Sequence, residues 1–66
     1  MRGLVTKTQY RKNKPKASYG FIAGIDGETY WFHLKDESIK PNDEVEFKGA
    51  ENEKGFYAYD VAKIYQ

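Results

Sequence analysis

The sequence predicts an all-β fold in which five short antiparallel strands close into a small barrel. Segments rich in β-forming residues recur at short spacing, and no stretch keeps a helical period for three turns. Five strands within 66 residues are too few for a two-sheet sandwich, whereas a closed barrel leaves no strand edge exposed. We therefore expect residues 1–66 to form a single domain.

Three strands are predicted in the first half of the chain. Residues 3–10 are rich in β-forming side chains and give the first strand. A polar and basic connection, residues 11–17, leads into the second strand at residues 18–23. The glycine-bearing turn at residues 24–27 then joins the second strand to the third, residues 29–34, as a hairpin.

The second half of the chain supplies two more strands. Residues 35–42 are compatible with a helix, but Pro41 limits them to a turn or a single 3₁₀ turn. Residues 44–48 alternate between polar and apolar side chains and predict the fourth strand. Residues 50–55 form a predicted charged turn, and residues 56–64 form the fifth strand.

The alternation of side chains predicts a small core. In the fifth strand, Val61 shares a face with two tyrosines, while Ile64 shares the opposite face with two alanines, so the inward side is ambiguous. A β-bulge would bring the two sets together. The residues that we expect to point inward are Val5, Gly20, Ile22, Tyr30, Phe32, Val45, Phe47 and Val61.

Composition argues against several classes of function. Cysteine is absent and His33 is the sole histidine, so we expect no disulfide, no metal site and no other cofactor. No nucleophile, base and orienting group can be assembled around one histidine, so we expect no catalytic residues and no enzyme activity. No apolar run approaches the roughly 20 residues of a membrane span, which favours a cytoplasmic protein with no membrane partner.

Charge is distributed unevenly along the chain. The net charge is +1, but residues 1–33 carry six Lys/Arg against two acids, whereas residues 34–66 carry five lysines against eight acids. The two halves therefore have balances of +4 and −3. Solubility alone can explain such a pattern. The positive half of the chain also holds the rings of two aromatic segments, residues 18–22 and 30–34. This coincidence favours a surface that binds a polyanion.

Two short segments carry aromatic side chains at alternate positions. These are Tyr19 and Phe21 in the second predicted strand, and Trp31 and His33 in the third. Residues two apart in a strand point to the same face, so each pair shares one side of the sheet. Flat rings exposed to water indicate a binding surface, and nucleobases suit such a surface because every base can stack on a ring.

The side of the third strand that faces the core is undecided by hydrophobicity. Hydrophobicity alone nearly balances a core position for Trp31 against core positions for Tyr30 and Phe32. In the fifth strand, Tyr57 and Tyr59 could either extend the exposed rings or fill the barrel.

The two aromatic segments resemble motifs of the cold-shock domain family. Tyr-Gly-Phe-Ile at residues 19–22 resembles the first RNP-type motif, usually Gly-Phe-Gly-Phe-Ile, and Trp-Phe-His-Leu at residues 31–34 resembles the second, usually Phe-Val-His-Phe. Residues 41–47 are similar to the family's fourth strand, and Lys54-Gly55 to the start of its closing strand. The resemblance implies an OB-type barrel that binds single-stranded RNA or DNA with low sequence specificity, as a monomer.

Carried over by motif, the resemblance implies a set of contact residues. This chain departs from the family where strand one usually ends in a Trp-Phe pair, because Lys7-Thr8 stands there and the nearest substitute ring is Tyr10. The connection that follows, with Lys16, is longer and more basic than usual, so we expect weaker stacking and a larger electrostatic share. The expected nucleic-acid-binding residues are Lys7, Tyr10, Lys16, Tyr19, Phe21, Trp31, His33 and Lys54.

A protein-interaction module is the alternative function. The same exposed rings could serve as interface anchors on a small β-barrel. Lys7 and the basic connection favour nucleic acid, because a generic peptide-binding face has no need of them. A barrel that grips proline-rich peptides would be expected to carry an acidic rim beside its aromatic residues.

Overall fold

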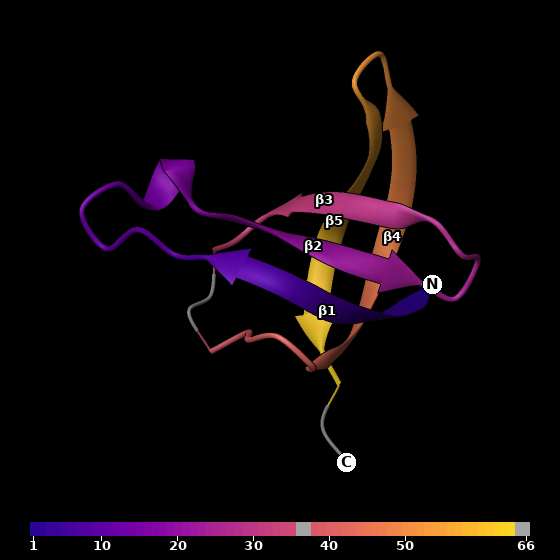
Figure 1. Ribbon diagram of the computed structural model, residues 1–66, viewed down its shortest axis with the longest axis horizontal. Coiled ribbons are helices and arrows are strands. Elements are labelled where there is room, and N and C mark those ends of the chain that lie inside the picture. Colours follow the sequence, from indigo (N-terminus) through magenta and orange to yellow (C-terminus); the bar gives the residue numbers. More distant parts are fainter. Residues whose placement is uncertain (36–37, 65–66) are drawn as a thin grey trace.

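The computed structural model describes residues 1–35 and 38–64 and confirms the all-β fold (Figure 1). No α-helix occurs in these two ranges, and a single 3₁₀ turn, η1 (Pro15–Ala17), lies in the basic connection. The five strands are β1 (Arg2–Gln9), β2 (Tyr19–Gly24), β3 (Thr29–His33), β4 (Glu44–Asn52) and β5 (Gly55–Lys63).

The strands close into an OB-type barrel in the order β1-β2-β3-β5-β4, with β4 pairing back onto β1. Four of the five pairings within the described residues are antiparallel, as expected. The fifth pairing is parallel and joins β3 to β5, with Trp31 opposite Tyr57. It corrects the expectation of an all-antiparallel barrel, and it places β5 beside the aromatic segments.

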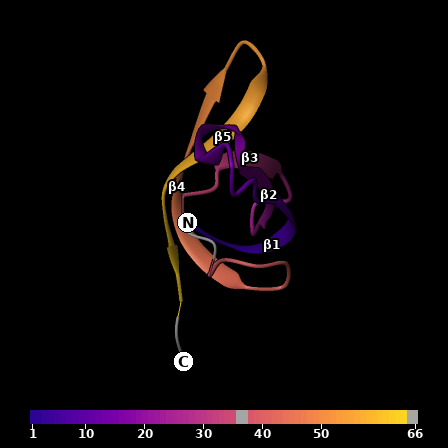
Figure 2. The same ribbon diagram turned by 90° about the vertical axis from the view of Figure 1, so that its left-hand side faces the viewer.

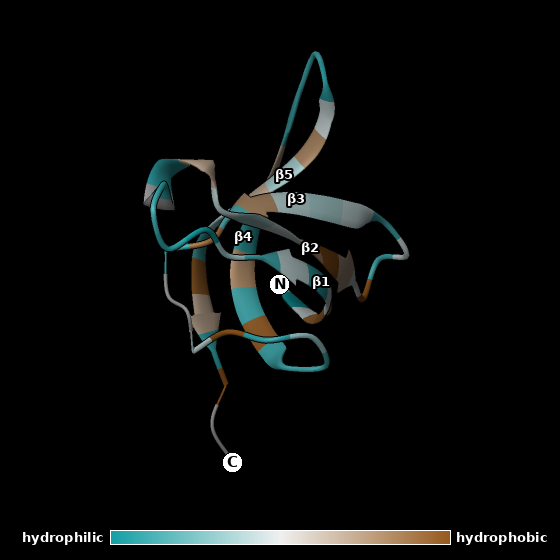
Figure 3. Ribbon diagram, turned by 60° about the vertical axis from the view of Figure 1, so that its left-hand side comes forward, coloured by the Kyte–Doolittle hydropathy of each residue, from teal (hydrophilic) through white to brown (hydrophobic). Residues whose placement is uncertain are grey.

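The core is the one that the alternation predicts, with additions. Every expected core residue is buried except Val61, which is partly buried and packs against the core cluster. The hydrophilic and hydrophobic residues that alternate along β4 are visible in Figure 3. Leu34, Ile39 and Ala58 are also buried, although none of them was among the expected core residues. Leu34 follows β3 and has the same parity as Tyr30 and Phe32, whereas Ile39 lies between strands, where alternation gives no signal.

A β-bulge in β5 resolves the ambiguity of that strand. The register of β5 against β4 shifts between Glu46 and Lys48, which leaves one extra residue on β5. Asp60, at the shift, has a φ of 52°. Because of the extra residue, Ala58 and Val61 both turn toward the core although they are three positions apart. The predicted bulge is therefore confirmed.

Gly20 allows β2 to lie close to the core ring of β3. A Cβ atom at this position would lie 2.6 Å from Cε1 of Phe32 and 2.8 Å from the carbonyl oxygen of Lys7. Only glycine leaves room for that approach, so Gly20 faces the inside, as expected. Its inward position turns Tyr19 and Phe21 to the outside of the sheet.

The connections between strands were predicted less well. Residues 50–55 are not a turn throughout, because β4 continues to Asn52 and the turn is confined to residues 53–54. Here Ala50 pairs with Tyr57 and Glu51 with Phe56, so strand pairing continues without a buried face. Within residues 35–42, the described part forms turns, as Pro41 predicted, while residues 36–37 lie outside the described residues.

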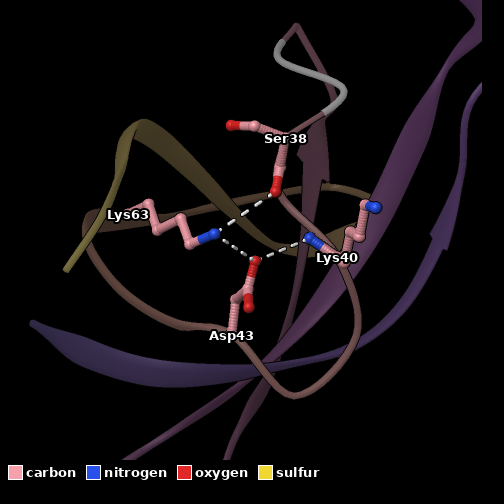
Figure 4. A network of polar contacts seen from close by, with 4 residues as sticks. All are labelled: Ser38, Lys40, Asp43 and Lys63. Carbon is pink, nitrogen blue, oxygen red and sulfur yellow. Dashed lines mark hydrogen bonds and ion pairs between the residues drawn. The ribbon is translucent and has the colours of Figure 1, made fainter. Parts of the chain in front are cut away.

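An ion pair fixes the loop before β4 to the end of β5 (Figure 4). The Asp43 carboxylate accepts a hydrogen bond of 2.8 Å from the Lys40 backbone N–H and lies 3.3 Å from Nζ of Lys63. The Lys63 ammonium also donates to the carbonyl oxygen of Ser38 at 3.5 Å. The Lys40 amide and the Lys63 ammonium together hold the pKa of Asp43 below its ordinary value.

Tyr30 closes the barrel at the β2–β3 turn. Its ring packs against Phe47 and Phe56, with centroids 5.0 and 5.5 Å away, and its hydroxyl donates to the Asp26 carboxylate. That hydrogen bond is the main reason why the pKa of Tyr30 is raised to about 12 and the pKa of Asp26 is lowered. In the turn itself, the N–H of Gly27 donates to the carbonyl oxygen of Gly24, which confirms the predicted hairpin.

Across the described ranges, no helix has the length and apolar character needed to cross a membrane.

Candidate functional site

The structure resolves the parity of β3. Tyr30 and Phe32 are 4% and 0% exposed, whereas Trp31 is 43% exposed on the opposite face of the same strand. Because neighbours in a strand alternate, His33 lies on the same outer side as Trp31. The rings that the sequence left undecided therefore divide into an inner pair and an outer pair.

Strand pairing arranges the outer side chains in two rows that run across the strands. In the first, the tryptophan row, Lys7 lies opposite Phe21, Phe21 opposite Trp31, and Trp31 opposite Tyr57. This row crosses β1, β2, β3 and β5. Four strands thus present one continuous line of three rings and one ammonium group.

The second row, the histidine row, lies one step along the strands. Gln9 is opposite Tyr19, and Tyr19 is opposite His33. Tyr59 continues the row, because it follows Tyr57 by two positions and borders the same cavity as His33. Together the two rows form what we call the outer aromatic face.

Contacts between neighbouring side chains hold the rings of this face. The Tyr19 and Phe21 rings meet edge-on, with centroids 5.9 Å apart and planes at 85°. The ring centroids of Trp31 and His33 lie 6.5 Å apart. The Tyr19 hydroxyl also donates to Oε1 of Gln9 at 3.1 Å. These contacts limit the freedom of the rings, and side chains that are already ordered lose less entropy when a surface is covered.

A groove opens beside the tryptophan row. It has a volume of about 770 Å³ and lies between the rings of Phe21, Trp31 and Tyr57 and the tip of the β4–β5 hairpin. At that tip, the Lys54 backbone N–H donates to Oδ1 of Asn52 at 2.9 Å. The hairpin thereby carries Lys54 to the edge of the outer aromatic face.

The basic connection lies at the other end of this face, where β1 ends and β2 begins (Figure 1). Its base is anchored by Ser18, which is buried and accepts a hydrogen bond of 2.7 Å from the Arg11 backbone N–H. The four basic side chains of the connection are all exposed; they are Arg11, Lys12, Lys14 and Lys16. The connection can therefore supply positive charge near the histidine row.

The structure brings together six of the eight expected binding residues. Five of them lie in the two rows, and Lys54 lines the groove: Lys7, Tyr19, Phe21, Trp31, His33 and Lys54. Tyr10 and Lys16 are exposed but lie outside the rows, beyond the end of β1 and in η1. Tyr10 therefore belongs to neither row of the outer aromatic face.

Several residues of the outer aromatic face and of the groove were absent from the sequence-based set. These are Gln9 and Tyr59 in the histidine row, Tyr57 in the tryptophan row, and Asn52 and Phe56 in the groove. The alternation of Tyr57 and Tyr59 was a usable signal. The position of Tyr57 beside Trp31 could not be predicted, because it depends on the parallel pairing of β3 and β5.

The outer aromatic face combines flat rings with positive charge. Flat rings offer stacking area, and the ammonium groups of Lys7 and Lys54 offer positive charge, so the face suits a planar and anionic ligand. In residues 1–35 and 38–64, no group of three or more His, Cys, Asp or Glu side chains is arranged to hold a metal ion.

Comparison with known proteins places the chain in no family, since no family model and no curated protein sequence matches it.

Proposed function

We propose that this protein binds single-stranded RNA or DNA with low sequence specificity, in the manner of the cold-shock domains that its motifs resemble. The observation that carries the proposal is the outer aromatic face, in which Phe21, Trp31 and Tyr57 follow one another across three strands. Cations lie at its margins, with Lys7 in the row itself and Lys54 at the groove. Bases stack on the rings, and phosphates meet the cations.

The size of the face fits this function energetically. Each base that stacks on an aromatic ring contributes about 1–3 kcal/mol. Three or four such stacks give micromolar affinity after the cost of ordering the strand has been subtracted. Because every base has a flat face, stacking distinguishes poorly between sequences, and low specificity follows.

The same proposal makes the protein a cytoplasmic, monomeric binding module with no catalytic residue, no cofactor and no membrane partner. A protein-interaction module on the same rings is the competing function. The charges distinguish the two, because phosphate contacts need Lys7, Lys54 and the basic connection, whereas an apolar peptide does not.

The proposal is tested by the fluorescence anisotropy of end-labelled oligonucleotides. We expect a labelled oligothymidylate and an oligouridylate to bind with micromolar affinity, and a blunt duplex of equal length to bind much more weakly, because its bases are already stacked. Equal binding of duplex and single strand would show that charge alone acts. No binding of any single strand at low salt would leave the protein-interaction module as the better account of the rings.

A further inference from the structure

The β4–β5 hairpin rises out of the barrel beside the tryptophan row. Figures 1 and 2 show it extending beyond the other strands in both views. Its last pairs join Ala50 to Tyr57, Glu51 to Phe56 and Asn52 to Gly55. This extra length is what makes one wall of the groove, because Asn52, Lys54 and Phe56 all line it.

The lining of the groove differs from that of two other cavities on the described residues. Four aromatic residues line it: Phe21, Trp31 and Tyr57 of the tryptophan row, and Phe56 at the start of β5. The remaining side chains that line it are those of Thr29, Asn52 and Lys54, so its charge is positive. The other two cavities each include Asp60 beside a lysine.

The volume of the groove fits a small ligand. At about 770 Å³ it lies within the range of roughly 300–1,000 Å³ that is usual for ligand sites. Its position is continuous with the tryptophan row, because Phe21, Trp31 and Tyr57 belong to both. A strand that stacks on Phe21 and Trp31 therefore already borders the groove, and its next step across the sheet brings it to Tyr57 and the hairpin.

We propose that this groove is an additional subsite for one unpaired nucleotide, and that it moves the footprint of the bound strand from β1 toward β5. The proposal rests on the proposed function. The base lies against the rings of Trp31 and Tyr57, and the Lys54 ammonium meets the adjoining phosphate. On β1 the two rows hold only Lys7 and Gln9, so that side of the face offers no ring.

The turn geometry prepares Lys54 for this contact. The Asn52 carboxamide accepts the Lys54 backbone N–H, which fixes the backbone of the tip. Gly55 follows at a φ of 128°, a conformation that glycine adopts without strain, and it starts β5 directly after Lys54. The ammonium group is thus presented from a held turn rather than from an open loop.

The test is a length series of oligothymidylates, from about three to eight nucleotides, titrated against Trp31 fluorescence at fixed low salt. For the wild-type chain, affinity rises when the oligonucleotide becomes long enough to enter the groove. Tyr57→Leu and Lys54→Gln are expected to weaken binding of the longer oligonucleotides by about fivefold or more, and to leave the shortest ones almost unchanged. Tyr57→Phe keeps the ring and is expected to bind like wild type.

Two matched controls separate the groove from net charge. Lys40→Gln removes the same charge from an exposed loop lysine that does not line the groove. Glu53→Gln removes the opposite charge from the same hairpin turn. If the subsite exists, Lys54→Gln has a clearly larger effect than either control, and its effect depends on oligonucleotide length.

The outcomes distinguish this subsite from the proposed function. If Phe21→Ala weakens binding while Tyr57→Leu and Lys54→Gln do not, single-strand binding stands and the subsite is wrong. If Lys40→Gln weakens binding as much as Lys54→Gln at every length, the groove cation acts only through net charge, and the subsite is again wrong. If wild-type protein binds no oligothymidylate, both are wrong. Lys54 is on an exposed turn, so its variant tests the idea even if Tyr57→Leu fails to fold.

Discussion

The inner and outer rings of β3 show how one strand of five residues presents two different faces. Tyr30 and Phe32 fill the barrel, and the Phe32 ring is completely buried. Trp31 and His33 alternate with them and lie on the outer aromatic face. Both pairs are aromatic, so residue type does not reveal which pair fills the barrel and which pair lies outside. The alternation of side chains along the strand decides it.

The parity of β3 is fixed by its neighbours rather than by its own sequence. Gly20 lies opposite Phe32 in the β2–β3 pairing and leaves room for its ring. On the other side, Phe32 pairs with the small and buried Ala58 of β5. Two small residues flank the large inner ring, whereas the partners of Trp31 across the strands are the large rings of Phe21 and Tyr57. Small partners across the strands therefore identify the inner face of β3.

The largest expected effect separates the two faces by stability. Phe32→Ala removes a buried ring and is expected to lower the free energy of unfolding by about 3–5 kcal/mol, most of what a domain of this size possesses. Trp31→Ala, on the outer face, is expected to cost less than about 1 kcal/mol. Urea denaturation followed by circular dichroism measures both. Equal losses for the two variants would invert the assignment of faces.

The next effect separates the two faces by binding. Phe21→Ala and Trp31→Ala are each expected to weaken oligonucleotide binding by about 1–3 kcal/mol, because each removes one stacking surface. Anisotropy titrations at constant salt measure the change. Ile25→Ala is the matched control, since Ile25 is an apolar side chain that is 79% exposed in the β2–β3 turn, outside both rows. A similar loss in the control would remove the distinction between the rows and the rest of the surface.

Neutralising the basic connection tests how much its charge contributes to binding. Changing Arg11, Lys12, Lys14 and Lys16 together to glutamine is expected to weaken binding about equally for all base compositions. If two of the four cations contact phosphates, the slope of log affinity against log salt becomes shallower by about 1.4. Quenching of Trp31 at saturation is expected to remain, because the rings are untouched. Unchanged affinity at low salt would show that the connection makes no phosphate contact.

The smallest expected effect concerns the inner ring that carries a hydroxyl. Tyrosine ionises near pH 10 in the unfolded chain, whereas the hydrogen bond to Asp26 raises the pKa of Tyr30 to about 12 in the fold. The stability that this bond contributes is therefore complete below pH 10 and is lost as the pH rises from 10 toward 12.

Tyr30→Phe tests that dependence. The difference in unfolding free energy between wild type and Tyr30→Phe is expected to shrink from about pH 8 to about pH 11, measured by urea denaturation. A difference that stays constant over this range would contradict the alkaline effect. On the acid side the pKa of Asp26 is lowered, so its contribution is present above pH 3.8 and is lost as the pH falls through the lowered value.

Local sequence pattern was enough to predict the five strands and the inner face of most of them. Alternation placed Val45 and Phe47 in the core, and Gly20 gave the inner side of β2, because these signals act between near neighbours in the chain. The parity of β3 needed the resemblance of its motif, since the hydrophobicities of its two faces nearly cancel.

Features that depend on distant pairing could not be predicted. The parallel contact of β3 with β5 leaves no local pattern, so the place of Tyr57 in the tryptophan row was hidden. The polar stretch at residues 50–52 looked like a turn, because strand residues outside the barrel bury no face and show no apolar alternation. The groove depends on both the β3–β5 pairing and the extension of β4. For this reason, Phe21, Trp31 and Lys54 were its only lining residues among the expected binding residues.

The most direct test of single-strand binding on the outer aromatic face is a salt series of Trp31 fluorescence titrations with an oligothymidylate. Trp31 is the only tryptophan, so its emission reports directly on the centre of the tryptophan row. We predict quenching on binding. About three to five phosphate contacts at roughly −0.7 each give a slope of log affinity against log salt of about −2 to −3.5. Binding without any change in Trp31 emission, or a slope near zero, would contradict the account.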